Sequence, residues 1–297
     1  MARGIARFFG DPTPIQHNYL ASDFLDDIGD LPVTKSVHIQ VGADLSDSIT
    51  ETRWLQLEAE RTPDGTPNAI VAFCDLSASN TDEILDAHLE SRNLRGVRQI
   101  VGRSPDENSI NTSDRVLDNP IWIENLARLP SRRLSFDLQL IPEQLPAATK
   151  VLSDIPDLRV ALCHCESPHD QSEDGLVFWR RELARLAELP NVFCKLSGYC
   201  MFEQNWNAER VRATALAAID IFGVNRCMFG SNFPVEKLYV SYQELYASYL
   251  DIIDSFSGSE KHALMATNAR QFFRLENQGL TQGRDQITCT GQQKRLI

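Results

Sequence analysis

A polar pair directly follows an apolar run in the segment CMFGSNFPV, residues 227–235. The run breaks at Gly230 into Ser231 and Asn232, and Pro234 ends any strand pairing because its nitrogen has no hydrogen to donate. Small hydrogen-bonding side chains at the carboxyl end of a buried strand lie where parallel α/β folds place ligands. This segment alone fits a ligand-binding strand end and an ordinary turn equally well.

Polar side chains also end six other apolar, strand-like runs. Parallel strands that are covered on both faces should be apolar on both faces, so these polar residues need an explanation. Successive side chains of a strand point to opposite faces, so each polar set can face one interior. The residues are, in chain order, His38, Gln40, Asp75, Ser77, Arg98, Asp137, Gln139, His164, Lys195 and Ser197. Together with Asn232 they predict a ligand pocket at the mouth of a barrel.

Strand patterns alternate with amphipathic helical patterns along the chain. Strands are predicted at 36–41, 69–74, 94–101, 134–140, 158–164, 191–196 and 226–230. Helices are predicted at 22–28, 51–60, 82–91, 145–152, 176–189, 208–222, 242–256 and 260–275, with one more capped by Asn119 before Pro120. This alternation indicates βαβ units and a parallel sheet. Seven strands are one short of a closed (β/α)8 barrel, so either the sheet is open or the first strand is missing.

The composition of the 297 residues is that of a globular protein. A net charge of −12 without a long basic run argues against nucleic acid and acidic membranes as partners, but it allows a small anionic substrate. No apolar stretch approaches the ~20 residues of a membrane span, and no signal-peptide core is present. The seven cysteines form no CxxC pair, which favours reduced thiols and a cytoplasmic location. Oligomeric state is left open.

Several motifs, in this order, resemble the amidohydrolase superfamily (amidohydrolase 2 type). The branch is that of 2-pyrone-4,6-dicarboxylate lactonase and the sugar-acid lactonases. The motifs are ETRWLQ at 51–56, GVRQIV at 96–101, FDLQL at 136–140, His164 with Pro168 and Asp170 downstream, KLSG at 195–198, RCMFGSNFPV at 226–235 and NARQFFRL at 268–275. The resemblance implies a TIM-type barrel domain over residues 1–275, here lacking its first strand. Residues 276–297 are predicted to be a flexible polar tail.

The resemblance also implies a hydrolase that opens a carboxylated or sugar-derived lactone, and the sequence departs from the family pattern twice. The family's first strand carries a His-x-His pair that is absent here, and Asn232 stands where the family usually has a metal-binding aspartate. A zinc site normally has three protein ligands, and His164 is the one credible ligand. We therefore expect no metal, with a divalent ion such as zinc as the alternative.

The predicted catalytic residues are His164, Asn232 and Asp137. His164 would polarise the lactone carbonyl or stabilise the oxyanion, and Asn232 would position the attacking water. The base is Asp137, Asp75 or a residue of the missing segment, and Asp137 alternatively forms an interior ion pair. Glu166 is interpreted as a loop carboxylate. The predicted substrate-binding residues are Arg98, Lys195, His38, Gln40, Asp75, Gln139, Ser197 and Ser231.

Two other functions stay open at this point. The first is a metal-dependent decarboxylase or another amidohydrolase of the same superfamily. The second is a truncated or non-catalytic relative that acts as a binding protein, in which the loss of a strand would expose two sheet edges. A phosphate-binding α/β protein has little support, because neither a P-loop nor a GxGxxG motif is present.

Overall fold

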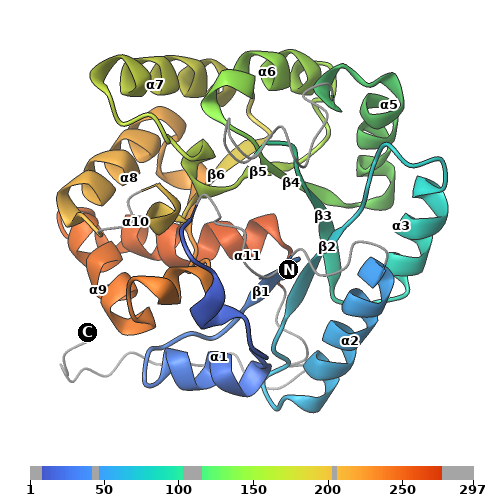
Figure 1. The fold of residues 1–297 in the computed structure, drawn as a ribbon, viewed down its shortest axis with the longest axis horizontal. Helices are drawn as coiled ribbons and strands as arrows, with labels where there is room; N and C mark the ends of the chain where they lie inside the picture. The colour runs from blue at the N-terminus through green and yellow to red at the C-terminus, as the bar shows by residue number, and fades with distance from the viewer. Residues whose placement is uncertain (1–8, 42–46, 103–115, 203–205, 276–297) are drawn as a thin grey trace, which may run out of the picture.

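Seven parallel strands form one curled sheet in the computed structural model, which describes residues 9–41, 47–102, 116–202 and 206–275. Each strand pairs with the next in chain order, as Figure 1 shows. The strands are β1 (Val37–Ile39), β2 (Ala69–Phe73), β3 (Leu94–Ile100), β4 (Ser135–Gln139), β5 (Val160–Leu162), β6 (Val192–Leu196) and β7 (Cys227–Phe229). The predicted class, a (β/α)8-type barrel lacking one strand, is confirmed over the described part of the chain.

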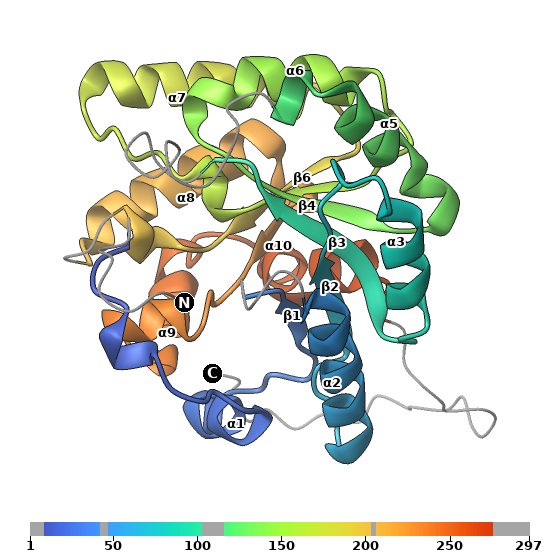
Figure 2. The ribbon, with the colours of Figure 1, turned by 45° about the vertical axis from the view of Figure 1, so that its right-hand side comes forward.

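Helices surround the sheet, most of them on its outer face (Figures 1 and 2). They are α1 (Ala21–Ile28), α2 (Ser48–Arg61), α3 (Thr81–Leu89), α5 (Pro120–Arg128), α6 (Leu145–Ser153), α7 (Glu173–Ala187), α8 (Ala208–Phe222), α9 (Tyr242–Ile252), α10 (Gly258–His262) and α11 (Asn268–Phe272). Asn119 caps α5 as predicted, because its side chain accepts hydrogen bonds from the backbone N–H groups of Ile121 and Trp122. Most expected helices are thus present, with ends displaced by a few residues.

The two faces of the sheet have separate cores. Outward residues such as Ile70, Phe136 and Leu162 pack in the larger cluster beneath the helices. Inward residues such as Val71 and Met228 belong to a second cluster inside the curl. Alternation of side chains along each strand produces this division, so the inward positions of β3 to β6 can carry polar groups without disturbing the outer core.

The predicted helix at 260–275 is broken into three pieces. A π-helical turn, Ala263–Thr267, separates α10 from α11. Asn268 anchors the start of α11, since its side-chain amide donates to the carbonyls of Val224 and Cys227 at 2.7 Å each. Phe272 then packs inside the curl with the inward strand residues. The C-terminal helix therefore fills the barrel interior rather than covering its outside.

Three further expectations concern the chain as a whole. No helix in the described ranges has the length and apolar character needed to cross a membrane. The six cysteines among the described residues are all buried and none forms a disulfide, as expected for reduced thiols. The tail predicted at 276–297 lies outside the described residues.

Candidate active site

A buried ion pair joins β4 and β6 inside the curl. Lys195 Nζ lies 2.5 Å from Asp137 Oδ2, and the Asp137 side chain is completely buried. Between them β5 presents only the small side chain of Ala161, which is in register with Asp137 and leaves room for the lysine to reach across. Burial alone would lower the pKa of Lys195, but the Asp137 charge outweighs it and raises that pKa. Lys195 is therefore charged at neutral pH.

Arg98 on β3 lies in register with Asp137 and links three strand ends. Its Nη1 donates to the carbonyl oxygen of Gln40 at 3.1 Å, and its Nη2 donates to Gln139 Oε1. Its Nε atom is buried and has no hydrogen-bond partner in the described part of the chain. These contacts fix the guanidinium near the Asp137–Lys195 pair while one N–H donor stays unused.

His164 lies at the end of β5 in a left-handed backbone turn. It and the next three residues, numbered 165–167, all have positive φ, with 60° at His164. Its Nδ1 is 3.0 Å from Ser197 Oγ, and its Nε2 makes no hydrogen bond among the described residues. Burial, reinforced by the charges of Arg98 and Lys195, lowers the pKa of His164 well below its usual value. The imidazole is therefore neutral at neutral pH.

The left-handed turn explains why strand periodicity describes this region poorly. Val160 and Leu162, which alternation along a strand would place on the same face as His164, belong to the outer core. The predicted strand at 158–164 ends at Leu162, and the turn that follows redirects His164 toward β6. Cys163 is two residues beyond the inward-facing Ala161, so alternation along the strand places its thiol on the interior side. It is close enough to Lys195 and Arg98 for their charges to oppose the burial that raises its pKa.

Gly198 determines where the His164 ring can lie. A Cβ atom at this position would be 2.3 Å from His164 Nδ1, and its φ of +70° is one that residues with side chains rarely adopt. We expect Gly198→Ala to displace the imidazole and to lower kcat/KM by up to about 100-fold, the cost of a misplacement of about 1 Å. The measurement is steady-state kinetics on a substrate that the wild-type protein turns over.

The matched control for this substitution is Gly258→Ala, because a Cβ there would have no neighbour within 4 Å. Wild-type kinetics in a folded Gly198→Ala protein would contradict the role given to Gly198.

Of the other predicted site residues, His38 does not reach the interior of the barrel, and Asp75 and Ser231 form local hydrogen bonds. His38 lies on the outer face of β1, and its Nε2 is 3.6 Å from Glu51 Oε1 of α2, so the structure does not bring it to the interior. Asp75 Oδ1 accepts a hydrogen bond from the backbone N–H of Ser77 at 2.9 Å. Ser231 Oγ accepts from the Phe233 N–H at 3.3 Å.

Asn232 adopts a left-handed conformation with φ 52°. Its carbonyl accepts the Glu236 N–H at 3.2 Å, and its Nδ2 atom is buried without a partner among the described residues. The strain and the unused donor are consistent with a functional role for Asn232.

Two buried carboxyl groups near the site accept hydrogen bonds from backbone N–H groups. Glu166, interpreted from sequence as a loop carboxylate, is fully buried and accepts the Leu140 N–H at 3.0 Å through Oε2. Glu236 is also fully buried and accepts the Cys200 N–H at 3.3 and 3.2 Å. Burial raises the pKa of Glu236 to about 7. Neither residue stands in a motif that would reveal its burial from sequence.

Replacing Glu236 should change how stability depends on pH. The folded protein holds this proton up to a pH of about 7, whereas the unfolded chain releases it near 4.5. Between these values the folded state binds more protons, so the free energy of unfolding falls as pH rises. Over this pH range we expect the free energy of unfolding of Glu236→Gln to fall by about 3 kcal/mol less than that of the wild type, because each pKa unit corresponds to 1.36 kcal/mol. Urea unfolding at a series of pH values measures it.

The exposed residue Glu209 provides the control, because Glu209→Gln removes the same charge from the surface of α8. If the free energy of unfolding varied with pH in the same way for the wild type and Glu236→Gln, the raised pKa assigned to Glu236 would be contradicted.

These contacts define the class of the protein as an open α/β barrel with a cluster of charged and polar side chains at the carboxyl ends of its strands. The family model described as amidohydrolase matches residues 14–275, and the chain belongs to that family. It is therefore assigned to amidohydrolase-type hydrolases, as its motifs predict.

Three similar proteins illustrate the relationship. The chain is 37% identical over 268 residues to the uncharacterized protein y4mH of Sinorhizobium fredii, covering 90% of this chain and 89% of that protein. It is 30% identical over 220 residues to an L-fucono-1,5-lactonase of Burkholderia multivorans, covering 70% and 71%. A zinc-bound crystal structure of an amidohydrolase from B. multivorans is 25% identical with a TM-score of 0.77, covering 89% and 91%.

The residues described here do not fit a metal ion. No group of three or more His, Cys, Asp or Glu side chains that could hold one occurs in the described ranges. His164, the candidate ligand, is close enough to Arg98 and Lys195 for both cations to lower its pKa. Two fixed positive charges beside a single imidazole disfavour a divalent cation, so no catalytic step is derived through a metal.

Proposed function

We propose that this protein hydrolyses a lactone that carries a carboxylate, and that it does so without a metal. The observation that carries the proposal is the cluster at the ends of β3 to β6. There two fixed cations, Arg98 and Lys195, adjoin a neutral histidine, His164. The similarity to an L-fucono-1,5-lactonase supports a lactone as the bond that is cleaved.

The two cations divide the substrate between them. Arg98 is partly exposed, and each of its two terminal nitrogens keeps an N–H after donating to Gln40 and Gln139, so it binds the carboxylate of the substrate. Lys195 uses one N–H on Asp137 and keeps donors for the developing oxyanion. The Asp137 carboxylate holds the lysine in place. This assignment gives the pair a positioning function as well as an electrostatic one.

His164 is better placed to act as the base than either aspartate. Asp137 is occupied by Lys195, and Asp75 by the Ser77 amide. With Nδ1–H donating to Ser197 Oγ, the lone pair on Nε2 accepts a proton from water that Asn232 orients. The water oxygen bonds to the carbonyl carbon, the ring C–O bond breaks, and the proton passes from His164 to the departing alkoxide. The product is a hydroxy acid.

Base-consuming hydrolysis of a panel of carboxylated and sugar-acid lactones, followed by pH-stat, tests the proposal. We expect turnover that survives EDTA, gains nothing from added zinc and falls at least about 100-fold in Arg98→Met. The control is Arg180→Met, which removes an exposed arginine from α7.

Turnover that EDTA abolishes and zinc restores would replace the metal-free mechanism by a metal-dependent one, as the zinc-bound relative suggests. A folded protein with no turnover on any lactone would point instead to a binding protein. An Arg98→Met variant with wild-type kinetics would remove Arg98 from substrate binding.

A further inference from the structure

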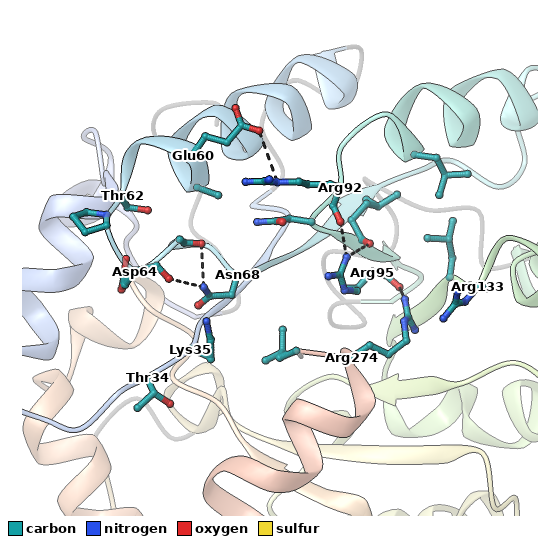
Figure 3. A pocket seen from close by; sticks show the side chains of 18 of the residues that line it. Thr34, Lys35, Glu60, Thr62, Asp64, Asn68, Arg92, Arg95, Arg133 and Arg274 are labelled. Atoms are coloured by element: carbon teal, nitrogen blue, oxygen red, sulfur yellow. Dashed lines mark hydrogen bonds and ion pairs between the residues drawn. The ribbon is translucent and has the colours of Figure 1, made fainter. Parts of the chain in front are cut away.

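A cavity lies at the opposite end of the barrel from the candidate active site. It has a volume of about 940 Å³ (Figure 3). Its walls come from the segments that enter the strands: Lys35 before β1, Asn68 before β2, Arg95 at the start of β3 and Arg133 before β4. Arg274, just after α11, completes it. The strand-end mechanism uses none of these residues.

Cationic side chains dominate the lining. Six of the residues that line the cavity are lysine or arginine, and two are carboxylates, in a protein whose net charge is −12. Glu60 lies 3.9 Å from Arg92, and Asp64 accepts hydrogen bonds from Thr66. Arg132 pairs with Asp82 and Asp86 outside the cavity. The positive charge of the cavity is therefore only partly neutralised.

Three cations of the lining make no ion pair with any carboxylate in the described ranges: Lys35, Arg133 and Arg274. Arg274 Nη2 donates to the backbone carbonyl of Arg95 at 3.1 Å, which holds the Arg274 guanidinium on the Arg95 side of the cavity. Figure 3 shows Arg95, Arg133 and Arg274 gathered there, with Lys35 toward the other side. Burial, and then the like charges of Arg95, Arg159 and Arg133, lower the pKa of Arg274.

Two of these three cations, Arg133 and Arg274, also have an uncommon backbone conformation. Eight non-glycine residues of the described ranges have positive φ. Five of them, 164–167 and Asn232, belong to the candidate active site, and two more are Arg133, at 58°, and Arg274, at 52°. Strained conformations of this kind concentrate at functional sites, because the surrounding structure must hold them in place. Both arginines line the cavity.

We propose that this cavity binds a small anion with at least two charged groups, either phosphoryl or carboxylate. Guanidinium groups bind both kinds of group through paired N–H donors, and Arg133 and Arg274 present two guanidinium groups on the same side of the cavity. A bound anion would relieve the repulsion between the arginines. Because the ligand would bind only the folded chain, it would also raise the melting temperature.

Isothermal titration calorimetry at low ionic strength tests this with pyrophosphate, citrate and chloride as probes. We expect one-to-one binding of pyrophosphate or citrate, with chloride far weaker. Stronger binding of pyrophosphate would identify a phosphoryl ligand, and stronger binding of citrate a polycarboxylate. Arg133→Gln and Arg274→Gln should each weaken that binding about tenfold or more. Arg133 is exposed, so its variant should fold even if Arg274→Gln does not.

Two control variants test whether the anion binds in this cavity. Arg180→Gln removes an exposed arginine elsewhere and should leave the affinity unchanged. Arg98→Met removes a cation from the candidate active site, which could itself bind an anion, and should likewise leave it unchanged. No saturable binding, equal binding of chloride, or a loss of affinity in Arg98→Met but not in Arg133→Gln would overturn the proposal.

Discussion

Substitution of His164 by alanine is expected to lower kcat/KM by at least about 100-fold while the protein stays folded. The imidazole is the one neutral, proton-accepting group identified beside Arg98 and Lys195, and its Nε2 makes no other hydrogen bond in the described part of the chain. Removing it takes away the acceptor of the water proton but leaves the Asp137–Lys195 pair intact. Initial rates by pH-stat, together with a urea unfolding curve, measure both effects.

The pH profile gives this prediction a second readout. A base must be unprotonated, and burial lowers the pKa of His164 well below 6.5. We therefore expect kcat/KM of the wild type to hold as pH falls through 6.5 and to decline only at lower pH. His262→Ala, which removes an exposed histidine from α10, is the matched control. An acid limb centred at or above 6.5, or full activity in His164→Ala, would contradict the assignment.

The sheet was predictable because its order follows from simple physical rules. Apolar runs that alternate with amphipathic helices can bury both faces only as a parallel sheet, and all seven predicted runs contain a strand of the structure. The polar residues of the central strands were predictable for the same reason. Asp137 and Lys195 interrupt inward faces that would otherwise be apolar, and Asp137 forms an interior ion pair, the alternative to its catalytic role, with Lys195.

Position along a strand is a weaker guide where the strand is short. His38 was expected to face the interior with Gln40, but β1 has three residues, and Val37 and Ile39 pack against the inner cluster. His38 therefore points outward to α2. At the end of β5, four consecutive left-handed residues redirect His164, and strand periodicity says nothing about the direction of a chain beyond the strand.

Residues that lie far apart in the sequence are the hardest to assemble. The cavity at the amino ends of the strands joins Lys35 to Arg274 across most of the chain. Glu236 becomes a buried acid only because the turn at Cys200 folds over it. Both the cationic cavity and the buried acid arise from contacts between distant segments, and no local sequence pattern indicates them.

Substitution of Lys195 by methionine is expected to have the largest effect on stability, a loss of about 3–5 kcal/mol in the free energy of unfolding. The Asp137 side chain has no exposed surface, and its Oδ1 has no hydrogen-bond partner in the described ranges. Without Lys195 the carboxylate would be buried with no opposing charge at its Oδ2, and that is more costly than losing the pair altogether. Urea unfolding of Lys195→Met measures the loss, with Lys150→Met on the exposed face of α6 as control.

The double variant Asp137→Asn/Lys195→Met separates the two contributions of the pair. It removes the buried charge together with its partner, so it should recover most of the stability that Lys195→Met loses. It should not recover turnover, because the donors for the oxyanion are still missing. If the double variant recovered both stability and turnover, the pair would have only a structural role. If Lys195→Met lost less than about 1 kcal/mol in the free energy of unfolding, water would have to reach Asp137.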